Sequence, residues 1–298
     1  MREDFDEVLR VFNLGRVDLH EQQSPTRCQV IRAVGSVVDS AIKIYPADAD
    51  IGELSTELAF VSHLYTSKLP VPRYRTTRDG SRFIKQQDGT LATVYDWIEG
   101  PVRPTLDGTE VFPRVVKLMA TIHIASADFR TPRSDDWLWQ DAKMCLERLG
   151  SVPQDLLKRL TKLFAKGQPW RPYDTHHLCH NDYGSSNIVW RSSDDTPWLI
   201  DFTNAIRAPR EWDLAGLCAD HLLRSATPLE PKAVLAQAAM THDNETCARL
   251  DRALLATCFP IVLGQRAVFA AFNADDDAPP CTWNGLRRVL DVADTQNV

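Results

Sequence analysis

The residues between His180 and Asp201 combine the side chains that one type of chemistry needs. His180 is followed two positions later by Asp182, Asn187 comes after four further residues, and Asp201 stands within a short apolar run. Phosphoryl transfer requires a carboxylate beside the accepting hydroxyl and separate oxygen ligands for Mg²⁺ on the nucleotide phosphates. Asp182 has the position of the first group, and Asn187 and Asp201 are candidates for the second.

Asn187 and Asp201 are predicted to face each other across a β-hairpin. Residues 187–190 pair in this prediction with residues 198–202, around a polar turn centred on Asp194. In that register positions 187 and 201 lie opposite one another, with Cβ atoms roughly 5 Å apart, which suits two ligands of one metal ion. The alternative is that Asn187 caps a turn and Asp201 is an exposed carboxylate at a strand end.

The elements that must position these residues change in character near Gly100. Apolar runs at 28–34, 41–45 and 91–98 predict strands. Between the second and third runs, the capping-box spacing of Asp50 and Glu53 predicts the start of a helix. Its apolar stripe consists of Leu54, Leu58, Val61 and Leu64.

The chain after Gly100 is mainly helical in this prediction. Asp107 and Glu110 have a second capping-box spacing ahead of an apolar stripe, and helices are expected after Asp213. The length of 298 residues is sufficient for about two domains. The expected fold class is α+β, with a small N-terminal lobe of antiparallel sheet plus one helix (residues 1–99) and a larger, mainly helical C-terminal lobe (residues 100–298).

The composition of the chain argues against several classes of function and location. The chain has 34 Lys and Arg against 40 Asp and Glu, a net charge of −6, which argues against nucleic acid as the main partner. Seven scattered cysteines without a C-x-x-C pair indicate a reducing compartment. The acidic N-terminus is unlike a signal peptide, and the apolar run 253–264 is shorter than the roughly 20 residues that span a bilayer. We therefore expect a cytoplasmic protein without a membrane partner; no oligomeric state is indicated.

Lys43 and Glu57 are charged residues whose neighbours on the predicted strand and helix face are apolar. Lys43 interrupts the second strand, where a lone lysine either faces solvent or binds phosphate. Glu57 falls within the apolar stripe of the helix when successive residues are placed about 100° apart. A carboxylate on that face needs a cation. Glu57 is therefore the expected ion-pair partner of Lys43, with Glu53 at the edge of the stripe as the alternative.

The motifs resemble those of the aminoglycoside phosphotransferase and choline kinase superfamily, small-molecule kinases with a protein-kinase-like fold of two lobes. Its members carry H-G-D-x-x-x-x-N, then I-D-F or I-D-W, then D-L-A. This chain has the matching residues at 180–187, 200–202 and 213–215. It departs from the pattern at Asn181, where glycine is usual, and at residues 184–186, where many members have His-Pro-Gly.

The resemblance implies a role for each matching position. Asp182 becomes the catalytic base, Asn187 and Asp201 the Mg²⁺ ligands, and Asp213 a residue that steadies the catalytic loop. Lys43, paired with Glu57, becomes the residue that binds the nucleotide phosphates.

Two further nucleotide contacts are expected from the small lobe. Residues 92–100 resemble the family's hinge, where the carbonyl of Asp96 and the N–H of Ile98 would bind adenine. Ser24 lies in the segment expected to contact phosphate, although no G-x-G-x-x-G is present and an ordinary turn is an equal alternative.

The function expected is transfer of the γ-phosphate of ATP to a hydroxyl of a small molecule with Mg²⁺, with GTP as an alternative nucleotide. A protein Ser/Thr kinase is less favoured because 11 residues (202–212) separate Asp201 from Asp213, too few for an activation segment. A non-catalytic nucleotide-binding scaffold would have lost one of Lys43, Asp182, Asn187 or Asp201.

The acceptor is expected to be cationic, such as an amino-alcohol or an aminoglycoside-like compound. Asp275, Asp276 and Asp277, or Asp220, are candidates to hold its amine. A solvated loop is the alternative for the acidic run. The histidines and the cysteine at 176–180 do not predict a zinc site, because no second ligand cluster accompanies them.

Overall fold

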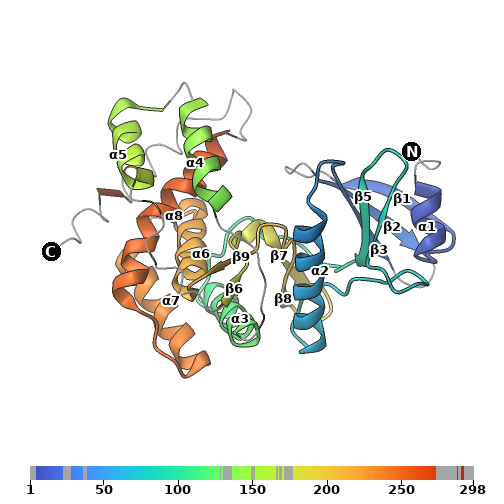
Figure 1. The fold of residues 1–298 in the computed structure, drawn as a ribbon. Coiled ribbons are helices and arrows are strands. Elements are labelled where there is room, and N and C mark those ends of the chain that lie inside the picture. Colours follow the sequence, from blue (N-terminus) through green and yellow to red (C-terminus); the bar gives the residue numbers. More distant parts are fainter. Residues whose placement is uncertain are drawn as a thin grey trace. The chain divides into compact units, whose positions relative to one another are not determined.

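The computed structural model describes residues 5–22, 28–35, 39–127, 129, 136–148, 152–165, 167, 170, 177–227, 229–272, 287 and 290–291. The chain forms two compact units (Figure 1). One consists of residues 1–101 and 189–203, and the other of residues 102–188 and 204–298. The predicted break at residue 99 lies close to the first of these limits.

A five-stranded antiparallel sheet forms the centre of the first unit. Its spatial order is β1 (Val17–Gln22), β2 (Gln29–Gly35), β3 (Ser40–Tyr45), β5 (Leu91–Asp96) and β4 (Phe83–Lys85). The three strands predicted from apolar runs are present as β2, β3 and β5. In the β3–β5 register, Lys43 lies opposite Thr93.

Two helices pack on this sheet through different sets of side chains. The short helix α1 (Asp6–Val11) packs with a cluster that includes Ile42, whereas α2 (Ile51–Thr66) packs with a cluster that includes Tyr45. Because alternate residues of a strand point to opposite faces, Lys43 shares the Tyr45 face. The start of α2 confirms the predicted cap, since the Asp50 carboxylate accepts a hydrogen bond from the N–H of Glu53 at 2.9 Å.

The predicted hairpin is present as β7 (Ile188–Arg191) and β8 (Thr196–Leu199). It was expected in the C-terminal lobe, but residues 189–203 pack with the first unit. The N–H of Trp190 donates to the carbonyl of Pro101 at 2.9 Å, and that of Leu199 donates to Pro70 at 3.0 Å. Gly100 permits this approach, because a Cβ there would lie 1.9 Å from the Trp190 oxygen.

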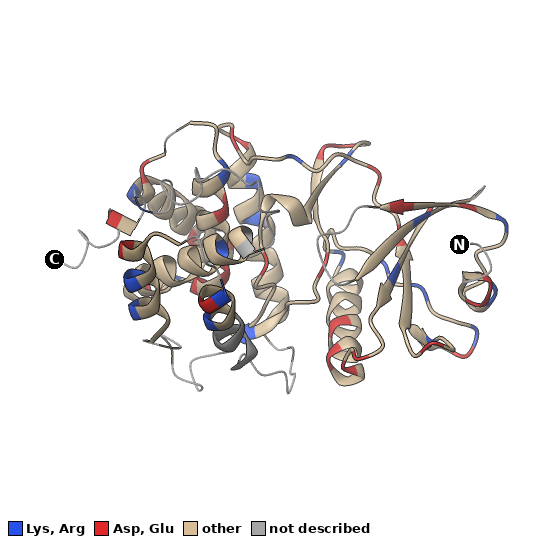
Figure 2. Cartoon of the chain, turned by 90° about the horizontal axis from the view of Figure 1, so that it is seen from above, with Lys and Arg blue, Asp and Glu red and all other residues tan. Residues whose placement is uncertain are grey.

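The second unit is mainly helical. Its helices are α3 (Val111–Ser126), α4 (Asp136–Arg148), α5 (Gln154–Ala165), α6 (Arg210–Arg224), α7 (Pro231–Thr246) and α8 (Arg252–Phe272). Helix α6 packs on α8, and α3 packs on α7 (Figure 1). A two-stranded sheet pairs β6 (His177–Cys179) with β9 (Ile206–Ala208). Basic and acidic residues are interspersed along these helices (Figure 2).

The capping box predicted for α3 is wrong. Glu110 is the N-cap residue, but no side chain caps this end of the helix. Asp107 instead accepts a hydrogen bond from the N–H of Ala226 at 3.0 Å. The apolar stripe itself is confirmed, since Val115, Met119 and Ile122 are buried.

Helix α8 contains the long apolar run of the sequence. Of the described helices, it is the one whose length and composition would allow it to cross a membrane, over Arg252–Phe269. That segment is 56% buried within the protein, and α8 packs against α4, α5 and α6. We therefore interpret α8 as a core helix of the second unit.

Candidate active site

Lys43 is buried in the first unit between two carboxylates. Its side chain is 3% exposed, and Nζ lies 2.8 Å from Oδ1 of Asp201 and 3.7 Å from Oε1 of Glu57. Nζ also donates a hydrogen bond to the hydroxyl of Thr203. The sequence therefore placed Lys43 and Glu57 together correctly, whereas Glu53 is exposed.

Several hydrogen-bond donors surround the buried carboxylate of Glu57. The hydroxyls of Tyr45 and Tyr74 donate to Oε1 at 3.1 and 3.2 Å. Burial alone would lower the pKa of Lys43, but the charges of Glu57 and Asp201 outweigh that effect and raise it well above its usual value. The ammonium group is therefore retained at neutral pH. Tyr45 and Tyr74 were not singled out in the sequence, and no motif marks them.

Asp201 follows the hairpin in a conformation that few non-glycine residues adopt. Its φ is 60°, in the left-handed region. The Thr203 hydroxyl donates to Oδ1 of Asp201 at 2.7 Å. The ring of Phe202 packs edge-on against that of Phe60 in α2, with 5.8 Å between the ring centroids. These contacts hold the carboxylate in place despite the strain. Asp201 thus lies beyond the end of β8 rather than within the strand as predicted.

Asp182 and Asn187 form a local pair in the second unit. Asn187 ends a short 3₁₀ helix (Ser185–Asn187), and its Nδ2 donates to both the carbonyl oxygen and Oδ2 of Asp182 at 2.9 Å. The Asp182 carboxylate is 44% exposed.

These contacts fit the predicted roles in Mg²⁺ binding. Because the amide nitrogen of Asn187 makes both bonds to Asp182, its Oδ1 is the atom left to ligate a cation. Asp201 contributes a carboxylate, the other kind of oxygen that Mg²⁺ prefers. Asn187 and Asp201 belong to different units, so their predicted face-to-face placement stays a prediction.

Asp213 fixes the backbone of the loop of residues 180–187, which is the predicted catalytic loop. Its two oxygens accept the N–H groups of His180 and Asn181, each at 2.7 Å. Asn181 has a φ of 65°, a conformation that asparagine tolerates better than most residues, and its Oδ1 accepts from the indole of Trp212 at 2.8 Å. Asparagine can therefore replace the glycine usual at this position without loss of the loop's shape.

A buried pair of histidines extends this network. His123 of α3 bonds Asp213 through Nε2 at 3.2 Å and His242 of α7 through Nδ1 at 3.0 Å. Burial would raise the pKa of Asp213, but His123 and the loop N–H groups lower it below its usual value. Burial, together with the charges of His123 and other basic neighbours, lowers the pKa of His242 to about 3. His242 is therefore neutral at physiological pH. Sequence reasoning did not identify either histidine.

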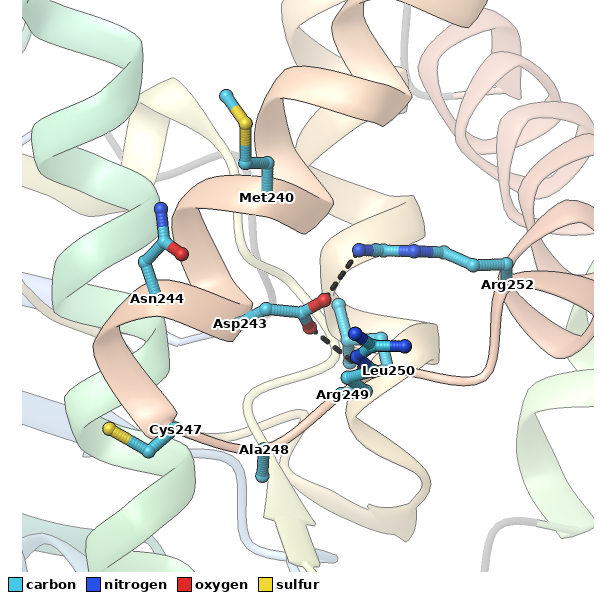
Figure 3. Close-up of a pocket in the computed structure, with 8 residues that line it drawn as sticks. All are labelled: Met240, Asp243, Asn244, Cys247, Ala248, Arg249, Leu250 and Arg252. Atoms are coloured by element: carbon cyan, nitrogen blue, oxygen red, sulfur yellow. Dashed lines mark hydrogen bonds and ion pairs between the residues drawn. The ribbon is translucent and has the colours of Figure 1, made fainter.

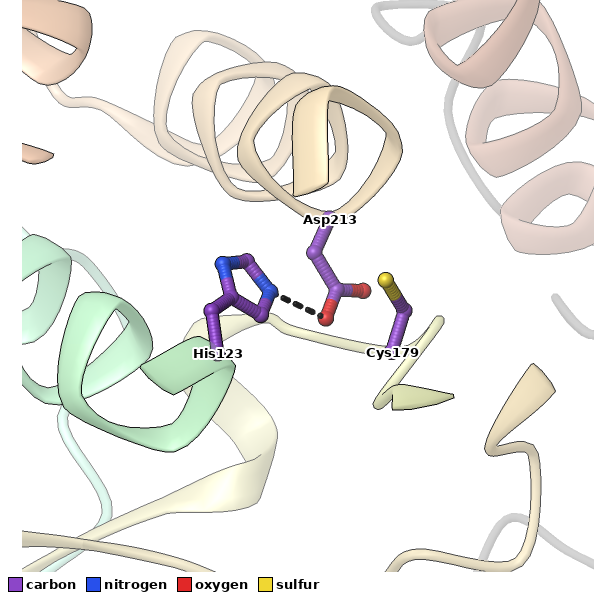
Figure 4. A group of neighbouring side chains, drawn as sticks. All are labelled: His123, Cys179 and Asp213. Carbon is purple, nitrogen blue, oxygen red and sulfur yellow. Dashed lines mark hydrogen bonds and ion pairs between the residues drawn. The ribbon is translucent and has the colours of Figure 1, made fainter. Parts of the chain in front are cut away.

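His123, Cys179 and Asp213 lie close enough to resemble a metal site (Figure 4). Their contacts argue otherwise. Asp213 already accepts bonds from the loop and from His123, and the Cys179 thiol donates to the carbonyl of Ala208 at 3.4 Å. Burial raises the pKa of Cys179 well above its usual value, which disfavours the thiolate that a metal needs. We interpret the group as support for the catalytic loop.

The remaining predicted nucleotide contacts lie in the first unit. Asp96 ends β5, its carboxylate accepts from Nε of Arg75 at 2.9 Å, and Ile98 follows it. The proposed adenine contacts use their backbone groups and stay predictions. Ser24 lies outside the described residues, as do Asp275, Asp276 and Asp277.

A pocket of about 690 Å³ lies elsewhere, at the junction of α7 and α8 (Figure 3). It is lined by Met240, Asp243, Asn244, Cys247, Ala248, Arg249, Leu250 and Arg252. The Asp243 carboxylate accepts the N–H of Leu250 at 2.9 Å and pairs with Arg252. These bonds close the α7–α8 turn, and none of the residues that line the pocket is among the site residues predicted from the sequence.

Comparison with known proteins identifies the family and the fold of the chain. The phosphotransferase enzyme family matches residues 18–250. No curated protein sequence matches significantly. Among solved structures, an amicoumacin kinase in complex with AMP-PNP and Ca²⁺ aligns with a TM-score of 0.74 and 15% identity, over 99% of this chain and 95% of that one.

Two other kinases show the same fold. A microcompartment-associated aminopropanol kinase aligns with a TM-score of 0.65 and 16% identity, over 96% of this chain and 94% of that one. A choline kinase from Cryptosporidium parvum Iowa II aligns with a TM-score of 0.66 and 12% identity, over 94% of this chain and 89% of that one. The predicted α+β, protein-kinase-like fold is confirmed. The chain belongs to the phosphotransferase enzyme family and is a small-molecule kinase, and it shares its fold with an aminoglycoside phosphotransferase and with choline kinases.

Proposed function

We propose that the protein transfers the γ-phosphate of ATP to a hydroxyl group of a small molecule, with Mg²⁺ as the metal. The observation that carries the proposal is the exposed Asp182 carboxylate, oriented by Asn187 on a loop that Asp213 holds. In the proposed step, the hydroxyl proton passes to Asp182 as the acceptor oxygen bonds to the γ-phosphorus. The bond from that phosphorus to the β–γ bridging oxygen breaks, and its electron pair leaves with ADP.

The other site residues bind and orient the nucleotide. Lys43, whose charge Glu57 maintains, binds the phosphates, and Asn187 and Asp201 hold Mg²⁺, which when bound neutralises phosphate charge. Asp96 and Ile98 bind adenine through backbone groups. The unit of residues 1–101 and 189–203 serves the nucleotide, while residues 102–188 and 204–298 carry the base and the acceptor site. The amicoumacin kinase was solved with a nucleotide and a divalent cation, which supports the use of both here.

The pattern of cysteines in the sequence supports a reducing location. Seven cysteines are scattered along the chain, and none forms a C-x-x-C pair. We propose that the enzyme acts in the cytoplasm, where ATP is also available.

The test is a screen of hydroxyl compounds with purified protein and Mg²⁺, in which release of ADP is measured. ATP and GTP are compared in parallel, and Asp182→Asn serves as the matched inactive control. Acceptor-dependent ADP release by the wild type but not by the control is the expected result. Equal release by both proteins would contradict the proposal.

A further inference from the structure

Arg266 extends from α8 to the catalytic loop through space that two glycines leave open. A Cβ on Gly216 of α6 would lie 3.3 Å from Nη2 of Arg266, and a Cβ on Gly184 of the loop would lie 3.2 Å from Nη1. Real Cβ contacts are seldom so short. The Asp220 carboxylate, whose Oδ1 would lie 2.9 Å from a Cβ on Gly184, and the guanidinium together occupy the space that a side chain at residue 184 would need.

The guanidinium is held between two carboxylates. Nη1 lies 3.7 Å from Oδ1 of Asp182 and 3.8 Å from Oδ1 of Asp220, and Nη2 donates to the carbonyl oxygen of Tyr183 at 3.1 Å. The Nε atom is buried and has no hydrogen-bond partner among the described residues. Arg266 is thus largely removed from water while its outer nitrogens face the catalytic loop.

Asp220 does not depend on Arg266. Its Oδ1 accepts from Nε of Arg224 at 2.8 Å, and its Oδ2 accepts the N–H of Ser185 at 2.8 Å. Asp182, by contrast, has Arg266 as its described cationic partner and is otherwise bonded by the neutral amide of Asn187. The positive charge of Arg266 is therefore more consequential for Asp182 than for Asp220.

We propose that Arg266 is a positioning residue for phosphoryl transfer, whose charge holds the Asp182 carboxylate in its reactive orientation on the acceptor side of the site. The inference rests on the proposed function, because it acts through the base of that reaction. Charge at a distance near 4 Å is sufficient for this role, since attraction between opposite charges persists without a direct hydrogen bond and strengthens where water is excluded. The residue contacts neither nucleotide phosphates nor metal in this proposal.

The experiment compares Arg266 with Arg224. Both arginines contact Asp220, but of the two only Arg266 contacts Asp182. Steady-state kcat and the KM for ATP are measured for the wild type, Arg266→Met, Arg266→Lys and Arg224→Met, with an acceptor from the screen. We expect Arg266→Met to lower kcat roughly tenfold or more and to leave the ATP KM within about twofold. Arg266→Lys, which keeps the charge, should recover most of the loss, and Arg224→Met should match the wild type within about twofold.

Equal kcat values for Arg266→Met and Arg224→Met would overturn the inference, as would a lysine variant no better than the methionine variant. If Arg266→Met does not fold, Arg266→Gln replaces it, because glutamine keeps a polar donor at residue 266 but removes the positive charge. A wild-type kcat in Arg266→Gln would then overturn the inference. A wild type that turns over no ATP with any acceptor would instead contradict the proposed function, and the inference with it.

Discussion

The ammonium group of Lys43 donates a hydrogen bond to Oδ1 of Asp201 at 2.8 Å, although 158 positions separate the two residues in sequence. The residue proposed to bind the phosphates and the residue proposed to bind the metal are therefore paired with each other. Glu57, 2% exposed, completes the group. If Lys43 binds phosphate and Asp201 binds metal as proposed, we expect the Lys43–Asp201 bond to loosen when both are bound, while the Lys43–Glu57 pair persists.

Lys43→Met should lower both activity and stability. It removes the phosphate contact and leaves the buried Glu57 without its cation, and breaking a buried ion pair in this way costs roughly 3–5 kcal/mol. Chemical unfolding and kcat measure the two effects. The double variant Lys43→Met/Glu57→Gln should regain much of the stability but none of the turnover. A single variant as stable as the wild type would show that the pair does not hold this part of the fold together.

Asp182→Asn should retain affinity for ATP·Mg²⁺ while kcat falls roughly 10²-fold or more, because a base acts on the hydroxyl and not on the nucleotide. Asparagine keeps the shape of the residue beside Asn187. Nucleotide binding by calorimetry is measured alongside kcat. Turnover close to that of the wild type would remove Asp182 from the role of base.

Asp201→Ala should weaken nucleotide binding more than Asp182→Asn does. It removes a charged metal ligand, so that less of the phosphate charge is neutralised. Titration of Mg²⁺ against activity and nucleotide binding in the two variants distinguishes them. If Asp201→Ala keeps the Mg²⁺ requirement of the wild type, the metal is bound by other residues.

His242 should make the protein sensitive to acid. Its pKa in the folded protein is about 3, against 6.5 for a free histidine, so the unfolded chain binds a proton that the folded chain does not. Stability should therefore fall as pH decreases from about 6.5 towards 3, by up to roughly 1.4 kcal/mol per pH unit from this group. His123, His177, Arg210 and Arg252 all disfavour protonation here.

Urea unfolding of the wild type and His242→Asn between pH 4 and 7 measures this contribution. The variant should show a smaller decline in stability with acid, whereas His63→Asn, at an exposed position, should follow the wild type. Parallel declines in the wild type and His242→Asn would assign the acid sensitivity to other groups.

Local patterns in the sequence predicted the site residues whose position depends on a single helix, strand or loop. The helical phase of Glu57 placed it correctly, and the motif around Asp182 marked the loop. Residues brought in by tertiary packing carried no such signal. Tyr74 and Arg266 contact the site residues from distant segments, and neither lies in a recognisable motif. Asp107 was assigned to a helix cap because the competing donor, the N–H of Ala226, is remote in sequence.

A cationic acceptor remains the prediction, but the described residues change which groups should hold it. Asp220 is 4% exposed, and its oxygens bond Arg224 and Ser185. It is therefore a poor ligand for an acceptor amine, contrary to one of the two candidates expected from the sequence. The other candidate, the acidic run Asp275-Asp276-Asp277, should attract a cation and hold an ammonium group by charge-assisted hydrogen bonds.

The acceptor KM should then rise with ionic strength, because salt screens the attraction between exposed charges. Replacing all three aspartates by asparagine should raise this KM and remove most of its salt dependence, while the ATP KM stays nearly unchanged. Asp88→Asn, an exposed carboxylate of the first unit, is a suitable control that should alter neither value. An acceptor KM that responds to neither salt nor the triple substitution would show that the run is solvated surface. The acceptor would then be recognised without regard to its charge.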